Sequence, residues 1–130
     1  MQFAKTDESR DPLTEKIIGA AIEVHRTLGP GLLESVYEKC LCYELSQMGI
    51  QFTRQQEWPV KYKEILIDCG FRTDVIVEQR VVVEIKACQA VLPIHEATVM
   101  TYMKLSGINK ALILNFNVFL LKDGIQRFVL

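Results

Sequence analysis

Several protein classes are excluded by what the sequence lacks. No apolar run approaches the roughly 20 residues of a membrane-spanning helix, and residues 1–11 lack the apolar stretch of a signal peptide. None of the four cysteines belongs to a C-x-x-C pair, the short spacing on which zinc sites are built. These absences predict a cytoplasmic protein without a membrane segment, whose cysteines are reduced packing residues.

A basic excess is missing too, because 15 Lys and Arg residues stand against 16 Asp and Glu residues. Strong non-specific binders of nucleic acid usually carry net positive charge. A nuclease can do without that excess, since a bound divalent metal supplies local positive charge. The charge balance therefore speaks against a nucleic-acid substrate, but it does not speak against a metal-binding site.

The length and the apolar content predict one domain with a real core, because 49% of the 130 residues are hydrophobic. We expect a mobile polar tail over residues 1–11 and a single domain over 12–130. Apolar residues at helical spacing predict helices over 12–28, over 32–48 and from 93 to about 107. Alternating or β-branched stretches predict strands over 52–61, 64–69, 71–77, 81–87, 110–115, 118–121 and 125–130, the last two joined by a turn at Asp123-Gly124. This order predicts an α/β fold: a mixed β-sheet flanked by α-helices, with two N-terminal helices preceding a β-meander.

Packing fixes the register of the hairpin formed by 71–77 and 81–87. The apolar residues of the first strand must share a buried face with those of the second, since a slip of one residue would expose one set. That condition holds if Val77 pairs with Val81 across a loop of Glu78, Gln79 and Arg80.

This register gathers three charged side chains on the other face of the hairpin. Asp74 lies opposite Glu84, and Lys86 follows two residues later on the same face. Directly paired Cβ atoms lie about 5 Å apart, so the two carboxylates can share one cation. Oxygen ligands of this kind suit Mg²⁺ or Mn²⁺.

An ordinary Glu–Lys pair on a solvated sheet face is the alternative, because E-x-K is a common pattern. However, Glu84 and Lys86 interrupt an otherwise apolar run over 81–87. Such runs are typical of a strand covered on both faces. Charge placed there is costly unless it is paired or bound to metal.

The second helix carries an acid among its apolar residues. Projected at about 100° per residue, Glu34 falls beside Tyr37 and Leu41. A favourable contact with the helix dipole would also explain an acid there, and Glu44 falls within the same stripe. We favour Glu34 as the functional acid because it stands near the helix start, where a loop can open a cleft.

These residues resemble a known family. Gly31-Leu32-Leu33-Glu34-Ser35-Val36-Tyr37 matches the motif that names the GxxExxY proteins, a compact branch of the PD-(D/E)XK nuclease superfamily. The resemblance covers residues from about 13 to 130 and implies a restriction-endonuclease-like fold. It includes Leu28-Gly29-Pro30-Gly31, Phe71-Arg72-Thr73-Asp74, Val83-Glu84-Ile85-Lys86, Ile94-His95-Glu96-Ala97 and Asn115-Phe116-Asn117.

The resemblance implies a role for each of four charged residues. Asp74 and Glu84 would be metal ligands, Glu34 would be the acid of the preceding helix, and Lys86 would be the lysine of the superfamily core. The neighbouring carboxylates favour the charged form of that lysine. We therefore expect it to act by electrostatics rather than as a general base.

Three further side chains are candidates for substrate binding. Tyr37 completes the named motif, more by packing than by chemistry. Tyr102 stands where exonuclease-like relatives carry the tyrosine of Q-x-x-x-Y, although Thr98 replaces the glutamine and its DNA contact is not implied. His95 is either a substrate contact or a polar residue at a helix start.

Together these features predict a Mg²⁺- or Mn²⁺-dependent nuclease that acts on nucleic acid, with DNA favoured over RNA. The first alternative is a catalytically weak module that keeps the nuclease fold and binds nucleic acid or protein. The second is a structural homodimer that pairs through the apolar C-terminal strands.

Overall fold

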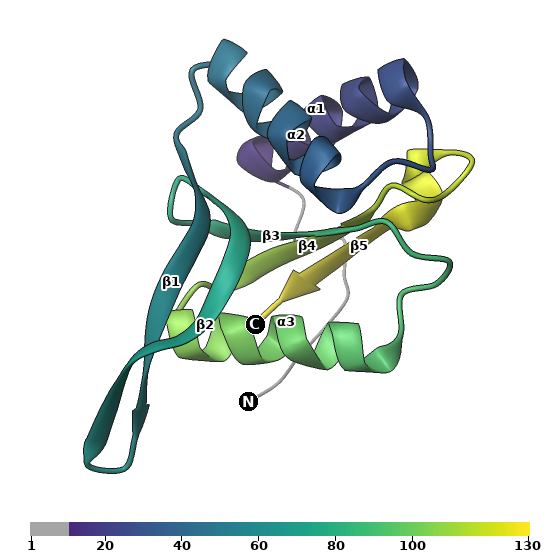
Figure 1. Ribbon diagram of the computed structural model, residues 1–130. Coiled ribbons are helices and arrows are strands. Elements are labelled where there is room, and N and C mark those ends of the chain that lie inside the picture. Colours follow the sequence, from purple (N-terminus) through teal and green to yellow (C-terminus); the bar gives the residue numbers. More distant parts are fainter. Residues whose placement is uncertain (1–10) are drawn as a thin grey trace.

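The computed structural model describes residues 11–130 as an α/β domain built on one five-stranded sheet (Figure 1). Its elements are α1 (Pro12–Leu28), α2 (Glu34–Gln47), β1 (Phe52–Tyr62), β2 (Ile65–Val77), β3 (Val81–Lys86), α3 (Pro93–Ser106), β4 (Lys110–Asn115), the 3₁₀ turn η2 (Leu121–Gly124) and β5 (Ile125–Val129). The strands lie in chain order, and all neighbours are antiparallel except β3 and β4, which α3 connects. This is the mixed, restriction-endonuclease-like sheet that the sequence predicted. Residues 1–10 of the expected tail lie outside the described residues.

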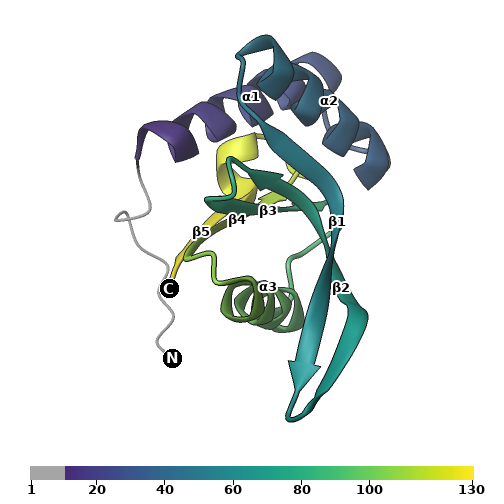
Figure 2. The same ribbon diagram turned by 90° about the vertical axis from the view of Figure 1, so that its left-hand side faces the viewer.

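Helices cover both faces of the sheet. Figure 2 shows α1 and α2 on one face and α3 on the other. A large apolar cluster joins α1 and α2 to the sheet, and a smaller one joins α3 to it. The members of β3 alternate between the two clusters, which explains why its sequence is almost continuously apolar.

The first helix begins where the sequence places its cap. Asp11 adopts an extended conformation, and its side chain accepts a hydrogen bond of 2.7 Å from the Thr14 N–H. Pro12 occupies the first turn, where its missing N–H has no partner to lose. Asp11 also pairs with Lys110 at the start of β4, so the helix start is attached to the sheet.

Two strands expected from the sequence, 64–69 and 71–77, are one continuous strand. The boundary expected at position 70 is absent, because Gly70 allows the two strands of the hairpin to approach closely. A Cβ atom at position 70 would lie 2.1 Å from Cγ2 of Val60 on β1. The register of β1 and β2 shifts between Trp58 and Val60, so the glycine accommodates a bulge inside the hairpin.

The predicted strand over 118–121 is wrong, and so is the hairpin that it would form. The chain there bends and enters η2, and β4 pairs directly with β5 through Leu114 and Ile125. The backbone of this segment is engaged by the first helix, because His25 Nε2 lies 2.9 Å from the Val118 carbonyl oxygen. Leu121 is buried in the larger cluster, so its apolar character reflects packing rather than sheet formation.

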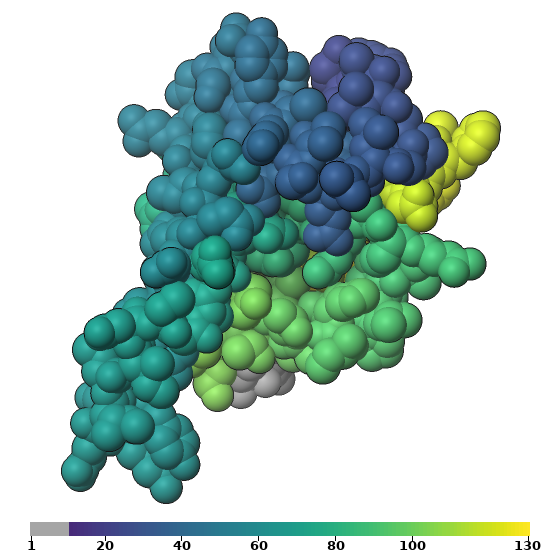
Figure 3. All heavy atoms as spheres, viewed as in Figure 1, coloured from purple at the N-terminus to yellow at the C-terminus, as the bar shows by residue number. Residues whose placement is uncertain are grey.

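The distal part of the β1–β2 hairpin leaves the body of the domain. Figures 1 and 3 show it as an arm beyond the sheet, and residues 61–70 are all exposed. All four cysteines are free, with Cys42 buried and Cys69 exposed on the arm, so the packing role predicted for cysteine fails at Cys69. Among residues 11–130, no helix combines the length and apolarity needed to cross a membrane.

Candidate active site

The β2–β3 hairpin has the register that the sequence predicted. Val77 pairs with Val81, and the ladder continues through Ile76 with Val82 and Val75 with Val83. Glu78 and Gln79 in the connecting loop have positive φ values of 53° and 52°, which turn the chain back tightly. The paired ladder ends at Val75 and Val83, and Asp74 and Glu84 are the next residues on each strand.

Beyond Val75 and Val83, bonds from backbone N–H groups to the carboxylates of Asp74 and Glu84 replace the backbone–backbone hydrogen bonds between the two strands. One carboxylate oxygen of Asp74 accepts the Ile85 N–H at 2.9 Å. One carboxylate oxygen of Glu84 accepts the Asp74 N–H at 3.3 Å. Each acid therefore bonds to the opposite strand, and the two carboxylates are held side by side where the strands diverge.

Glu84 is an acid in a poor environment for negative charge. Only 6% of the residue is exposed. Burial first, and the neighbouring charge of Asp74 second, raise the pKa of Glu84 to about 8. No cationic side chain in residues 11–130 forms an ion pair with either acid. A divalent cation fits this donor set, because two adjacent carboxylates supply hard oxygen ligands and form no ion pair with the described residues.

Lys86 completes the predicted group at the end of β3. It is half-buried, and its positive charge acts to lower the pKa of Glu84. It makes no ion pair with Glu84 in the described structure, so the ordinary Glu–Lys pair considered from the sequence is not formed. The end of the strand is anchored, since the Lys86 carbonyl accepts the Phe116 N–H at 2.9 Å.

Glu34 is not brought to the pair. It is the first residue of α2 and is exposed, although the helical projection placed it within the apolar stripe. Across residues 11–130, no three His, Cys, Asp or Glu side chains gather closely enough to hold a metal ion. The buried acid of α2 is Glu38, one turn later, which is 5% exposed. Its partners lie on β1, so nothing local in the helix sequence identified it.

Two of the three candidate substrate contacts have structural partners within the domain. His95 accepts the Leu92 N–H through Nδ1 at 3.0 Å, which caps the start of α3. Tyr37 is fully buried and stacks on Phe116 with ring centroids 4.4 Å apart. Both residues therefore have a structural role, and substrate binding by either of them stays a prediction.

Tyr102 is the candidate that lies beside the acids. Its ring stacks on Phe71 with centroids 4.7 Å apart. Partial burial, followed by the charges of Glu84 and Asp74, raises the pKa of its hydroxyl. The hydroxyl of Thr98, at the glutamine position of the expected motif, bonds back to the Ile94 carbonyl at 2.9 Å within α3.

Replacing Tyr37 by phenylalanine tests its structural role. The tyrosine hydroxyl donates to the Gly29 carbonyl at 2.6 Å and accepts the Leu32 N–H at 3.1 Å. Losing both bonds at a buried position is expected to lower the free energy of unfolding by about 1–3 kcal/mol, measured by urea denaturation. Tyr43→Phe is the matched control, because Tyr43 is exposed. A loss of Mn²⁺ binding or of DNA cleavage by Tyr37→Phe at unchanged stability would instead make Tyr37 a site residue.

Comparison with known proteins identifies the family of the chain. A family model described as the PD-(D/E)XK nuclease superfamily matches residues 11–128, which is nearly the whole chain. No curated protein and no solved structure matches this chain. Members of this superfamily are in general hydrolytic nucleases and typically use divalent metal ions. The chain belongs to the PD-(D/E)XK nuclease superfamily.

Proposed function

We propose that this chain is a divalent-metal-dependent nuclease that hydrolyses phosphodiester bonds in DNA, in the manner of the GxxExxY branch. The observation that carries the proposal is the pair of adjacent carboxylates, Asp74 and the buried Glu84, with Lys86 two residues further along the same strand. In the proposed site, Asp74 and Glu84 hold Mg²⁺ or Mn²⁺. Such a cation, when bound, polarises the phosphodiester and makes a bound water more acidic.

Each residue of the chain has a separate task in this proposal. The Ile85 N–H fixes the orientation of Asp74 by bonding one of its oxygens. Glu84 would hold the cation as a carboxylate, because the positive charge of the cation would offset the cost of burying the negative charge. Lys86 stabilises the negative charge that develops on the phosphoryl oxygens. Tyr102, next to both acids, orients the substrate.

Glu34 enters the proposal as a third metal ligand from the first turn of α2. The support for it is the family motif, Gly31 to Tyr37, and its accessible position at the helix start. Because Glu34, Asp74 and Glu84 do not gather into one group within residues 11–130, the role of Glu34 is tested on its own. Glu34→Gln is expected to weaken Mn²⁺ binding in calorimetric titration. Unchanged Mn²⁺ affinity would remove Glu34 from the proposed site.

Cleavage of labelled DNA in the presence of Mg²⁺ or Mn²⁺ tests the activity. Wild-type protein is expected to cleave, Asp74→Ala to lose activity, and Lys86→Ala to lose most of it. Equal activity in all three proteins would overturn the proposal. An RNA of the same sequence, assayed in parallel, tests the preference for DNA. Binding of nucleic acid without turnover by the wild type would favour a binding module instead.

A further inference from the structure

Gln55 of β1 has an unusual backbone conformation directly across from Asp74. The neighbouring pairs, Arg54 with Val75 and Gln56 with Thr73, place Gln55 opposite Asp74 in the register. Its φ angle is +50°, in the left-handed region that residues other than glycine rarely adopt. Such conformations persist where the surroundings hold them, and they concentrate at functional sites.

The side chain of Gln55 joins two acids from different elements. Its amide nitrogen donates to Glu38 of α2 at 2.9 Å and to Asp74 of β2 at 3.4 Å. Both partners are carboxylates, which accept hydrogen bonds only, so the amide nitrogen rather than the oxygen must face them. The two N–H groups of one amide thus connect the buried acid of the helix to an acid of the candidate site.

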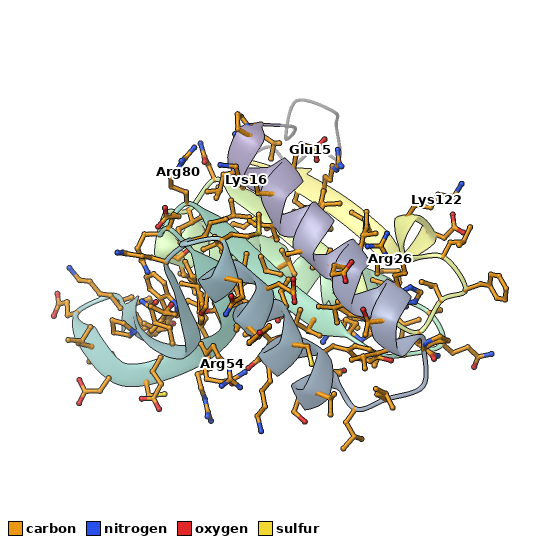
Figure 4. The ribbon with its side chains drawn as sticks, turned by 90° about the horizontal axis from the view of Figure 1, so that it is seen from above. Glu15, Lys16, Arg26, Arg54, Arg80 and Lys122 are labelled. Atoms are coloured by element: carbon orange, nitrogen blue, oxygen red, sulfur yellow. The ribbon has the colours of Figure 1, made fainter. Side chains whose placement is uncertain are left out.

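The charges in this chain of contacts leave Asp74 unneutralised. Arg54 Nε donates to Glu38 at 3.0 Å, and its Nη2 lies 2.9 Å from the same carboxylate oxygen in an ion pair, so the positive charge is matched by Glu38. Figure 4 shows Arg54 alongside α2. The hydrogen bonds that Asp74 accepts within residues 11–130 come from an amide side chain and a backbone N–H, both uncharged. A neutral donor orients a carboxylate without cancelling its charge, which a cation-binding acid requires.

We infer that Glu38 and Gln55 are positioning residues of the active site, forming a relay in which Glu38 fixes Gln55 and Gln55 fixes the carboxylate of Asp74 for a divalent cation. The inference deepens the proposed function, on which its metal-binding part rests. The left-handed backbone conformation occurs at Gln55, the residue whose side-chain amide bonds to both acids. We infer that this conformation serves the relay.

Gln55→Asn is designed to break the side-chain relay while preserving the backbone conformation of position 55. Asparagine adopts positive φ more readily than glutamine, so the variant is expected to keep the backbone conformation of position 55. Its side chain is one methylene shorter and cannot span both carboxylates. Mn²⁺ binding, measured by calorimetry, is expected to weaken by about 10–100-fold. Gln51→Asn, at an exposed position before β1, is the matched control and is expected to bind like the wild type.

A double-mutant cycle tests the relay without metal. Glu38→Gln and Asp74→Asn are expected to shift the urea midpoint non-additively in the wild-type background and additively in the Gln55→Asn background. Additivity in both backgrounds, or unchanged Mn²⁺ affinity in Gln55→Asn, would overturn the relay. Non-additivity in a wild-type protein that binds no Mn²⁺ would support the positioning of Asp74 and overturn the proposed nuclease function.

Discussion

Replacing Lys86 by methionine is expected to lower kcat for DNA cleavage by about 10²–10³-fold while leaving Mn²⁺ affinity nearly unchanged. Methionine keeps an unbranched apolar side chain at this half-buried position and removes only the charge. Lys86 forms no ion pair with the two acids in the described structure, so its charge remains available to the substrate. An interaction made with charge that develops only in the transition state changes kcat rather than binding.

Steady-state cleavage and calorimetric Mn²⁺ titration of the same protein samples check this expectation. Lys104→Met is the control, because Lys104 is exposed in the last turn of α3. Cleavage by Lys86→Met at the wild-type rate would remove Lys86 from the site. A parallel fall in metal affinity would show that the lysine acts by holding the two acids in place instead of acting on the substrate.

The central hairpin could be predicted from the sequence because its constraints are local. A strand repeats every two residues, so the valines of both strands admit only one register that buries them together. That register, with Val77 opposite Val81, also brings Asp74 next to Glu84. The fold class followed for the same reason, since each helix and most strands carry their own periodic pattern.

The acid of α2 could not be assigned in the same way. A helical projection treats the helix as if one side faced a uniform core, and it placed Glu34 within that side. Burial of the next acid along the helix, Glu38, depends on Arg54 and Gln55, which lie 16 and 17 residues further along the chain. Charged partners from another element make such a position tolerable, and no local pattern records them.

Two errors in the strand assignments have related causes. The sequence predicted separate strands before and after position 70, but the chain continues there, and its close approach to Val60 across the hairpin requires a residue without Cβ. The apolar stretch that contains Val118 and Leu121 looked like a strand, but His25 and the core bind it as an irregular segment. In both cases, a contact made across the fold overrides the local preference.

Glu84→Gln is expected to stabilise the metal-free protein above about pH 7. Burial and the charge of Asp74 raise the pKa of Glu84 to about 8 in the folded protein, from an ordinary value of 4.5. Between these values the folded protein holds a proton that the unfolded chain has released, so stability falls as the pH rises and is lowest above pH 8. At about 1.4 kcal/mol per pKa unit, the wild-type loss is on the order of 3–5 kcal/mol. Glutamine is uncharged throughout and escapes this loss.

Urea denaturation in EDTA at several pH values between 5 and 9 measures the effect. The wild type is expected to lose stability across this range, and Glu84→Gln to change much less. Glu78→Gln, at an exposed loop position of the same hairpin, is the control and should follow the wild type. Stability of the wild type that rises from pH 5 to 8, or the same pH slope in Glu84→Gln, would contradict the burial of a protonated acid.

Adding Mn²⁺ should reverse the order of the two proteins. Binding to the folded state alone stabilises it in proportion to the logarithm of the metal concentration above Kd. The wild type gains this stabilisation most at high pH, where Glu84 must otherwise carry its charge without compensation, whereas Glu84→Gln lacks one of the two carboxylates. The Glu84 carboxylate would then lower the free energy of unfolding without metal and raise it with Mn²⁺. Cation binding explains this reversal, whereas packing or a surface ion pair would not produce it.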